Sequence, residues 1–155
     1  MALVALAVFV VDRASKWFVV ERLGLAERLA IDVWPGVFGL RMAWNRGVNF
    51  GVLASDAEAM RWALIVLALA ISGCVAVWAL RRRDAWFVTG AGALIGGALG
   101  NAWDRAEYGA VADFLNVTCC GIVNPYAFNV ADVAIFAGAA GLAFAPDRKR
   151  AEAPR

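Results

Sequence analysis

The sequence predicts an all-α integral membrane protein with four transmembrane helices and a small extracytoplasmic β cradle. Three observations support this fold class. The 155 residues are 63% hydrophobic and 18% charged, whereas a soluble domain is about 45–50% apolar and about 25% charged. Four long apolar segments follow one another along the chain, and short apolar runs around a turn lie between the first two. Residues 1–150 are predicted to form a single domain, with residues 151–155 as a tail.

Each of the four segments is long enough to be a transmembrane helix, which needs about 20 mostly apolar residues. The first segment lacks a basic region before its apolar run and a small-residue cleavage site after it. We therefore expect a retained helix and not a cleaved signal peptide. The four segments cover about residues 1–20, 62–80, 85–103 and 127–145, and segments 21–61 and 104–126 connect them.

Basic residues predict the orientation of these helices. Residues 81–84 and 147–150 are dense in Arg and Lys, whereas the Arg residues of segment 21–61 are widely spaced and matched by acidic residues. Because cytoplasmic loops carry an excess of Lys and Arg, both termini and the 81–84 loop are predicted to be cytoplasmic. Segments 21–61 and 104–126 then lie outside.

The outer segments are not predicted to cross the membrane. In segment 21–61, Pro35-Gly36 and Gly39 separate short apolar runs such as residues 37–40. This pattern is typical of short strands around a turn, which predicts a small β platform lying on the membrane. Segment 104–126 is predicted to be a loop.

Polar residues gather at one end of the predicted helices. A charged side chain in a span costs roughly 2.5–3.5 kcal/mol on insertion scales, so each one needs an explanation. Asn101 and Arg105 lie at the outer end of the third segment, and Asn129 and Asp132 lie in the first turns of the fourth. Asp113 lies in the loop that joins these two ends. All five are therefore predicted near the outer surface of the membrane.

Taken one at a time, these residues have structural explanations. Asp12 and Lys16 are four apart on one helical face and could simply neutralise each other. Arg105 could extend to the lipid headgroups, and Asp132 could be an acid favoured at a helix N-terminus. Asp113 could be an ordinary loop acid. Glycines recur every four residues at 92, 96 and 100, which is typical of closely packed helices.

In combination, Asp113 and Asp132 are candidate catalytic residues of an aspartic hydrolase. Two carboxylates a few ångströms apart cannot both ionise cheaply, so the pair would keep one proton. The ionised member would take a proton from a water molecule that attacks a peptide carbonyl, and the protonated member would donate to the leaving amine. Because the titration belongs to the pair, the sequence leaves open which aspartate carries the proton.

Other chemistries lack the residues that they need. The chain has no His, which excludes Ser-His-Asp and Cys-His catalysis and the usual His-containing zinc sites. Its three Cys residues, which include the neighbours Cys119 and Cys120, predict neither a zinc site nor a disulfide framework. We therefore expect no metal and no cofactor. The net charge of +2 is too small and too scattered to indicate nucleic-acid binding.

Five motifs occur in order along the chain. They are DRASK at 12–16, NRGVNF at 45–50, GGALGNAWDR at 96–105, GAVADF at 109–114 and FNVAD at 128–132. As a set, they resemble the bacterial lipoprotein signal peptidases, also called signal peptidase II. The resemblance implies a four-helix membrane aspartyl peptidase with a periplasmic β cradle. Such enzymes remove the signal peptide from prolipoproteins, cutting just before a Cys that carries diacylglycerol.

The resemblance also implies roles for individual residues. Asp113 and Asp132 would be the catalytic pair, and Asp12 and Lys16 would brace the first helix. Many members carry two small residues where Val48 and Asn49 stand in the cradle motif, which leaves the contacts around Asn49 open. The residues expected to bind substrate or support the pair are Asn45, Asn101, Arg105 and Asn129.

The resemblance further implies partners and a location. The partners are prolipoproteins carrying diacylglyceryl-Cys, membrane lipid and the cyclic peptide inhibitor globomycin, and we expect a monomer. The protein would be a multi-pass protein of the bacterial inner membrane, with both termini cytoplasmic and the active site on the periplasmic side.

Two other functions are compatible with a polar cluster in a membrane protein. A proton-coupled transporter subunit could use Asp12, Lys16 and Asp132 as a relay. It would need titratable groups through the depth of the membrane, and the inner halves of the predicted helices carry little beyond Ser72 and Cys74. A non-catalytic membrane scaffold would leave the acid in the fourth segment unexplained.

Overall fold

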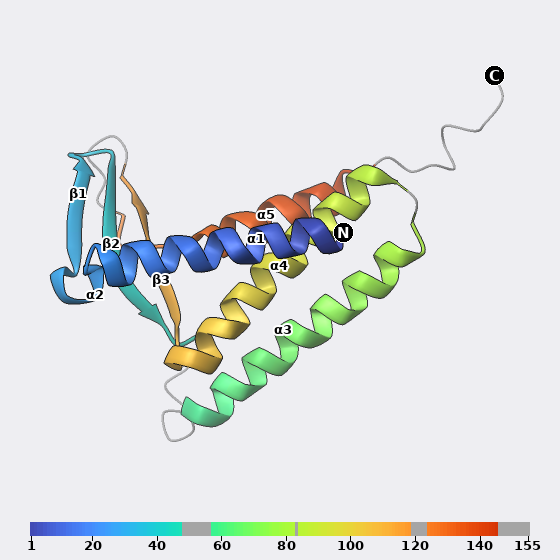
Figure 1. Ribbon diagram of the computed structural model, residues 1–155, viewed down its shortest axis with the longest axis horizontal. Coiled ribbons are helices and arrows are strands. Elements are labelled where there is room, and N and C mark those ends of the chain that lie inside the picture. The colour runs from blue at the N-terminus through green and yellow to red at the C-terminus, as the bar shows by residue number, and fades with distance from the viewer. Residues whose placement is uncertain (48–56, 83, 119–123, 146–155) are drawn as a thin grey trace.

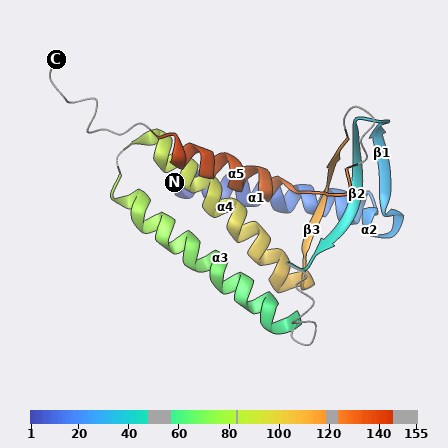
Figure 2. The same cartoon turned by 180° about the vertical axis from the view of Figure 1, so that it is seen from behind.

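A small sheet lies at one end of a group of helices in the computed structural model, which describes residues 1–47, 57–82, 84–118 and 124–145 (Figure 1). α4 packs against each of the other long helices and is therefore the central one (Figure 2). α1 continues into a π-helix, and the short helix α2 leads from there into the sheet. The bounds are α1 (Ala2–Lys16), the π-helix (Trp17–Arg22), α2 (Leu25–Arg28), α3 (Ala57–Leu80), α4 (Ala85–Tyr108) and α5 (Val130–Ala143).

The sheet has three antiparallel strands in the order β1-β2-β3. β1 and β2 form a hairpin, in which the Val37 N–H donates to the Trp34 carbonyl over 3.0 Å and closes the turn at Pro35-Gly36. The predicted pair of short strands around this turn is confirmed. The bounds are β1 (Ala30–Trp34), β2 (Phe38–Asn45) and β3 (Val111–Val117). Val48 and Asn49 of the predicted cradle motif, and Cys119 and Cys120, lie outside the described residues.

β3 corrects the prediction that segment 104–126 is a loop. Asp113 lies on this strand, opposite Ala43 of β2. Residues 111–114 are all buried, so the strand has no solvent-facing side on which polar residues would alternate with apolar ones. That alternation is the pattern that predicts a half-buried strand from sequence.

α4 and α5 have different ends from those predicted. α4 extends past 103 to Tyr108, where Gly109 adopts a φ of 77° and turns the chain into β3. α5 begins at Val130 and not at 127, because Phe128 pairs with Leu115 of β3 instead. With 14 residues, α5 is about 21 Å long.

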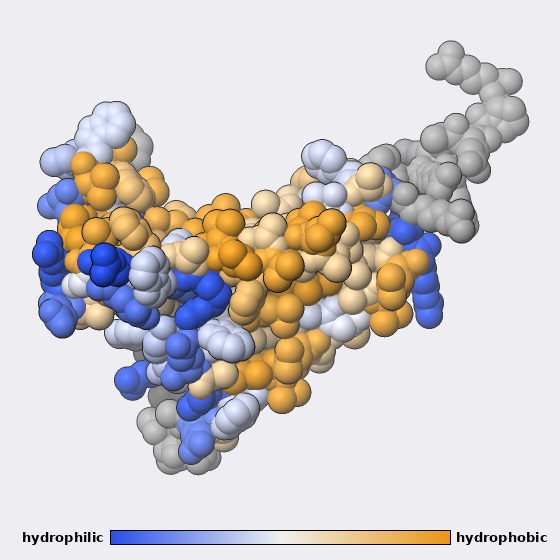
Figure 3. All heavy atoms as spheres, in the orientation of Figure 1, coloured by the Kyte–Doolittle hydropathy of each residue, from blue (hydrophilic) through white to orange (hydrophobic). Residues whose placement is uncertain are grey.

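Within the described ranges, one helix is long and apolar enough to cross a membrane, at Glu58–Leu80. α1 and α5 have only 15 and 14 residues, and α4 carries Asp104, Arg105 and Glu107 near its end. The four transmembrane helices therefore stay a prediction. Apolar side chains nevertheless cover the surface of the helices between the sheet and the opposite end (Figure 3).

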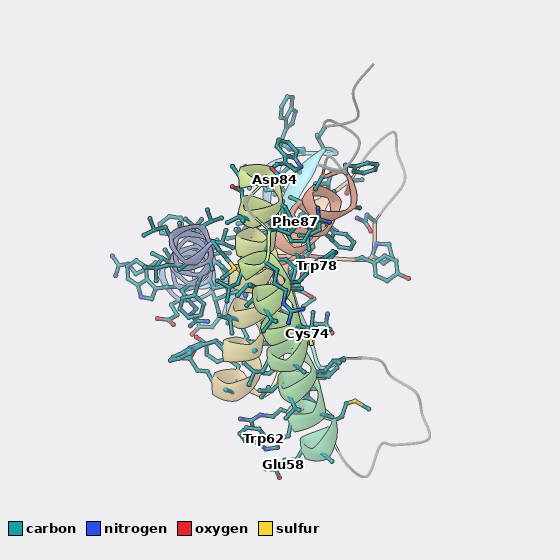
Figure 4. The ribbon with its side chains drawn as sticks, turned by 90° about the vertical axis from the view of Figure 1, so that its right-hand side faces the viewer. Glu58, Trp62, Cys74, Trp78, Asp84 and Phe87 are labelled. Atoms are coloured by element: carbon teal, nitrogen blue, oxygen red, sulfur yellow. The ribbon has the colours of Figure 1, made fainter. Side chains whose placement is uncertain are left out.

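α3 contacts α4 near both of its ends. At the connection between the two helices, the rings of Trp78 and Phe87 meet edge to face with their centroids 4.6 Å apart. Figure 4 shows this pair next to the connection and Trp62 toward the opposite end of α3. At that end, Arg61 Nη2 donates to the Ala106 carbonyl over 2.7 Å. A ring contact thus holds one end of α3 and an arginine hydrogen bond holds the other.

Glycines on two faces of α4 let its neighbours approach closely. Gly92 and Gly96 face α1, where a Cβ at Gly96 would lie 2.5 Å from the Ala5 carbonyl oxygen. On the other face, a Cβ at Gly90 would lie 3.0 Å from the Gly138 carbonyl oxygen of α5. The close helix packing predicted from the glycine spacing is confirmed.

We predict that a methyl group at position 96 forces α1 away from α4. Gly96→Ala should lower the free energy of unfolding by about 1–3 kcal/mol, the usual cost of overpacking, as measured by thermal unfolding in detergent. Gly73→Ala on α3 is the matched control, because a Cβ there meets no atom within 4 Å. It should leave stability unchanged or raise it, since Ala favours a helix. Equal melting temperatures for the two variants would contradict the close contact at Gly96.

Candidate active site

The N-terminus of α5 carries two of the predicted site residues in one local motif. Asn129 is the N-cap, and its Oδ1 accepts the Asp132 N–H over 2.9 Å. Asp132 Oδ2 in return accepts the Asn129 N–H over 3.2 Å. This capping box satisfies backbone donors at the helix start that have no partner within the helix. It also fixes the Asp132 carboxylate beside the Asn129 side chain.

Backbone hydrogen bonds bring β3 to this helix start. The Phe114 N–H donates to the Phe128 carbonyl over 3.0 Å, and the Phe128 N–H donates to the Leu115 carbonyl over 3.0 Å. Asp113 and Asn129 adjoin these paired residues in the sequence. As a result, Asn129 Nδ2 donates to Asp113 Oδ1 over 2.6 Å. Asn129 is therefore hydrogen-bonded to both Asp113 and Asp132.

Two further asparagines complete the contacts of this aspartate pair (Asp113 and Asp132). From α4, Asn101 Nδ2 donates to Asp132 Oδ1 over 2.8 Å, and Asn101 Oδ1 accepts from Asn129 Nδ2 over 3.2 Å. From β2, Asn45 Nδ2 donates to Asp113 Oδ2 over 3.1 Å. All four carboxylate oxygens of the pair thus accept a hydrogen bond from an asparagine. The structure brings together Asn45, Asn101 and Asn129, which the sequence analysis named as substrate-binding or supporting residues.

The environment of Asp113 favours its protonated form. Its side chain is 3% exposed, whereas Asp132 is half-buried. Burial, and then the nearby charge of Asp132, raise the pKa of Asp113 from 3.8 to about 6, against the opposing hydrogen bonds from Asn45 and Asn129. A carboxyl group that is partly protonated near neutral pH can act as an acid or as a base.

Arg105 lies beside the pair without contacting it directly. Its Nη1 donates to the Asn101 carbonyl over 3.2 Å, and it is close enough to interact electrostatically with Asp113 and Asp132. Its buried Nε has no hydrogen-bond partner among the residues that the structure describes.

Four charged residues form a buried ion cluster (Asp12, Arg13, Lys16 and Asp104) next to the aspartate pair. Lys16 Nζ lies 2.7 Å from a carboxylate oxygen of Asp12 and 2.7 Å from one of Asp104. Arg13 Nη1 lies 2.5 Å from the other Asp104 oxygen. The Asp12–Lys16 contact matches the predicted spacing, whereas the sequence analysis gave Arg13 and Asp104 no role. Asp104 stands in the same motif as Asn101, which is a signal that could have identified it.

Within the ranges that the structure describes, no three His, Cys, Asp or Glu side chains are grouped so that they could hold a metal ion. The chemistry available to the described residues therefore comes from the two carboxyl groups, the asparagine amides and the Arg105 guanidinium.

Comparison with known proteins identifies the family. The model of the signal peptidase (SPase) II family matches residues 4–145. The chain belongs to the signal peptidase II family. A lipoprotein signal peptidase of Methylobacterium sp. (strain 4-46) is 38% identical over 138 residues, which are 89% of this chain and 82% of that protein. One of Nitrobacter hamburgensis is 36% identical over 143 residues, covering 90% and 87% of the two chains.

Solved structures share the fold. A structure described as a bacterial membrane enzyme matches with a TM-score of 0.76 and 22% identity, and the match covers 92% of this chain and 89% of that one. A second one, described in the same words, has a TM-score of 0.71 and 23% identity. The resemblance to signal peptidase II found in the sequence is confirmed. Because the members of signal peptidase II are peptidases, a transporter subunit and a passive scaffold have no support.

We predict that the raised pKa of Asp113 makes stability depend on pH. The folded protein keeps the Asp113 proton up to about pH 6, whereas the unfolded chain loses it near 3.8. This group therefore stabilises the fold fully below that lower value, and its contribution is lost as the pH rises through about 6. Asp113→Asn removes the dependence, so its melting temperature relative to the wild type should rise by a few degrees between about pH 4 and about pH 7.

Thermal unfolding in detergent at a series of pH values tests this prediction. Asp84→Asn is the matched control, because Asp84 caps α4 away from the site and Asn is also a good N-cap. Melting curves for Asp113→Asn and the wild type that shift in parallel with pH would show that Asp113 keeps an ordinary pKa.

Proposed function

We propose that the protein is a membrane aspartyl endopeptidase that removes the signal peptide from prolipoproteins, cutting just before a Cys that carries diacylglycerol. Membership of the signal peptidase II family supports the substrate class. The observation that carries the aspartyl mechanism is the hydrogen bonding of one buried residue, Asn129, to both Asp113 and Asp132. Two acids from separate elements of the fold are thereby held beside each other.

The aspartate pair activates water with a single shared proton. The raised pKa of Asp113 supports this, because it arises from burial and from the charge of Asp132. The ionised carboxylate takes a proton from water as the oxygen attacks the scissile carbonyl. The protonated carboxyl group donates a hydrogen bond to that carbonyl, and a proton then passes to the leaving amine as the C–N bond breaks.

The surrounding polar residues have supporting roles in this proposal. Asn101 and Asn129 donate to the carboxylates and orient them, and neither adds a positive charge that would force both acids to ionise. Arg105 binds the substrate backbone, which is consistent with its unpaired Nε in the described part of the chain. Asn45 lies at the exposed edge of the site and reaches both Asp113 and substrate. Asp12 and Lys16 brace α1.

We propose that four helices span the bacterial inner membrane, with residues 1–150 as one domain. Large apolar side chains are exposed along α3, where Val66 is 63% exposed and Val77 is 53% exposed. A water-soluble protein rarely exposes so continuous an apolar surface. The exposed indoles of Trp62 and Trp78 lie toward opposite ends of α3 (Figure 4), as interfacial residues do. The sheet and the aspartate pair then lie on the periplasmic side, and Arg81 and both termini lie in the cytoplasm.

This location fits the chemistry of the substrate. A diacylglyceryl-Cys anchors the precursor at the outer leaflet, so the peptide bond before it lies close to the membrane boundary. A catalytic pair at the sheet end of the helices can reach that bond. We expect a monomer in contact with membrane lipid, and we expect globomycin to compete with substrate.

We predict that neither aspartate can be replaced by its amide. Asp113→Asn and Asp132→Asn should each lower kcat by at least about a hundredfold, because each removes an acid–base group. The measurement is cleavage of a diacylglyceryl-modified prolipoprotein by purified protein, with and without globomycin. Asp84→Asn makes the same chemical change at the opposite end of α4 and should cleave at the wild-type rate. Full processing by either variant of the pair would end the proposal.

We predict that activity falls at high pH because the pair must keep one proton. The profile of kcat/KM reports the pKa values of the free enzyme. Its basic limb should have a midpoint near the raised pKa of Asp113, at about 6. The rate should decline as the pH rises beyond that midpoint. A rate that stays constant between about pH 5 and about pH 8 would contradict a shared proton with this pKa.

A further inference from the structure

Two backbone N–H groups next to the aspartate pair are held by buried carboxylates of the ion cluster. The Ala112 N–H, in the residue before Asp113, donates to Asp104 Oδ2 over 3.2 Å. The Ala131 N–H, in the residue before Asp132, donates to Asp12 Oδ1 over 2.9 Å. Each aspartate of the pair is thus preceded by a residue whose N–H is bonded to a different buried acid.

One ammonium group joins these two acids. Lys16 Nζ lies 2.7 Å from Asp12 Oδ2 and 2.7 Å from Asp104 Oδ2, the same oxygen that accepts the Ala112 N–H. Its third contact is Asn101 Oδ1, at 3.4 Å. An ammonium group has three N–H donors, so each donor of Lys16 has a partner. Its side chain is 1% exposed, and those of Asp12 and Asp104 are fully buried.

We propose that Lys16 is a positioning residue that sets the separation of Asp113 and Asp132. Lys16 contacts Asp104, which accepts the Ala112 N–H before Asp113. It also contacts Asp12, which accepts the Ala131 N–H before Asp132. The inference rests on the proposed function for its catalytic consequence, although the linkage itself is independent of it. Lys16 touches neither carboxylate of the pair; its charge reaches Asp113 through space, whereas its positioning effect acts through these intermediates.

The geometry of the linkage leaves little freedom. Both oxygens of Asp12 are occupied, by Lys16 and the Ala131 N–H. Both oxygens of Asp104 are also occupied, because Lys16 contacts Oδ2 and Arg13 contacts Oδ1. Gly100 lets α4 approach Asp12, since a Cβ there would lie 2.6 Å from Asp12 Oδ2. The three elements that carry the pair and its supports, α4, β3 and α5, are therefore tied to one side chain of α1.

The separation of two like charges controls both their chemistry and their titration. If the separation changes, the mutual repulsion changes, and the two titration steps of the pair move. A misplacement of about 1 Å can cost about a hundredfold in rate. A purely structural ion cluster would affect the folded fraction and leave both quantities unchanged in the molecules that fold.

The test uses a variant that keeps every charge. Asp104→Glu moves the carboxylate by one methylene group while Lys16 and Arg13 keep their partner. We expect kcat to fall about ten- to a hundredfold, with KM within about twofold of the wild type. We also expect the carboxyl ¹³C titration of Asp113 and Asp132, recorded in detergent, to shift. Asp32→Glu is the matched control, because Asp32 pairs with Arg41 on the exposed side of the sheet and should change neither measurement.

A second variant keeps the test decisive if Asp104→Glu does not fold. The combination Lys16→Met, Asp12→Asn and Asp104→Asn leaves no unpaired buried lysine or aspartate in the cluster, and each amide oxygen can still accept its backbone N–H. Without the ammonium, the Asp113 and Asp132 sides of the site can separate, so kcat per folded molecule should fall.

The outcomes separate the two proposals. If the titration shifts in Asp104→Glu but the wild-type protein itself cuts no prolipoprotein, the linkage is upheld and the proposed function is overturned. Normal cleavage by both folded variants, with wild-type titration of Asp104→Glu, would overturn the linkage and leave the proposed function intact. A loss of activity that only follows the folded fraction, with KM, kcat per folded molecule and titration unchanged, would reduce the cluster to a structural role.

Discussion

The position of the Asn129 side chain is the constraint on which the site depends. Asn129 is fully buried, and its amide must find partners for two donors and one acceptor. It finds them in Asp113, Asn101 and the N–H of Asp132. A neutral amide can hold two acids close together, whereas a lysine or arginine in the same place would stabilise both as anions. Burial and the charge of Asp132 raise the pKa of Asp113, and the hydrogen bond from Asn129 opposes that rise only in part.

The fold is arranged so that this residue can be buried. Asn129 lies where the chain stops pairing with β3 and begins α5, so it receives contacts from a strand on one side and from α4 on the other. α4 can lie so close because glycines face both neighbouring helices. The sheet brings Asn45 and Asp113 to the same end. The polar contacts of the pair form where these elements meet, whereas much of the helix surface in Figure 3 is apolar.

The sequence predicted structure correctly where a residue type has one main structural role, such as turn formation or close helix packing. The turn at Pro35-Gly36 and the glycine spacing on α4 are of this kind, whereas the roles of the asparagines around the aspartate pair came from the resemblance to signal peptidase II. β3 could not be recognised because its residues are buried on both faces, and the start of α5 was misjudged because Phe128 is apolar but pairs with a strand. The linking role of Asp104 depends on which backbone groups lie nearby, which only the tertiary structure determines.

The packing around α4 is unequal, which has a consequence for how each neighbouring helix is held. α1 and α5 pack closely against α4 through glycines, whereas the only glycine of α3, Gly73, faces open space. α3 contacts α4 through the Trp78 and Phe87 rings at one end and through the hydrogen bond from Arg61 to the Ala106 carbonyl at the other. Among the long helices packed against α4, α3 is thus the one held by contacts at its ends and not by close glycine packing.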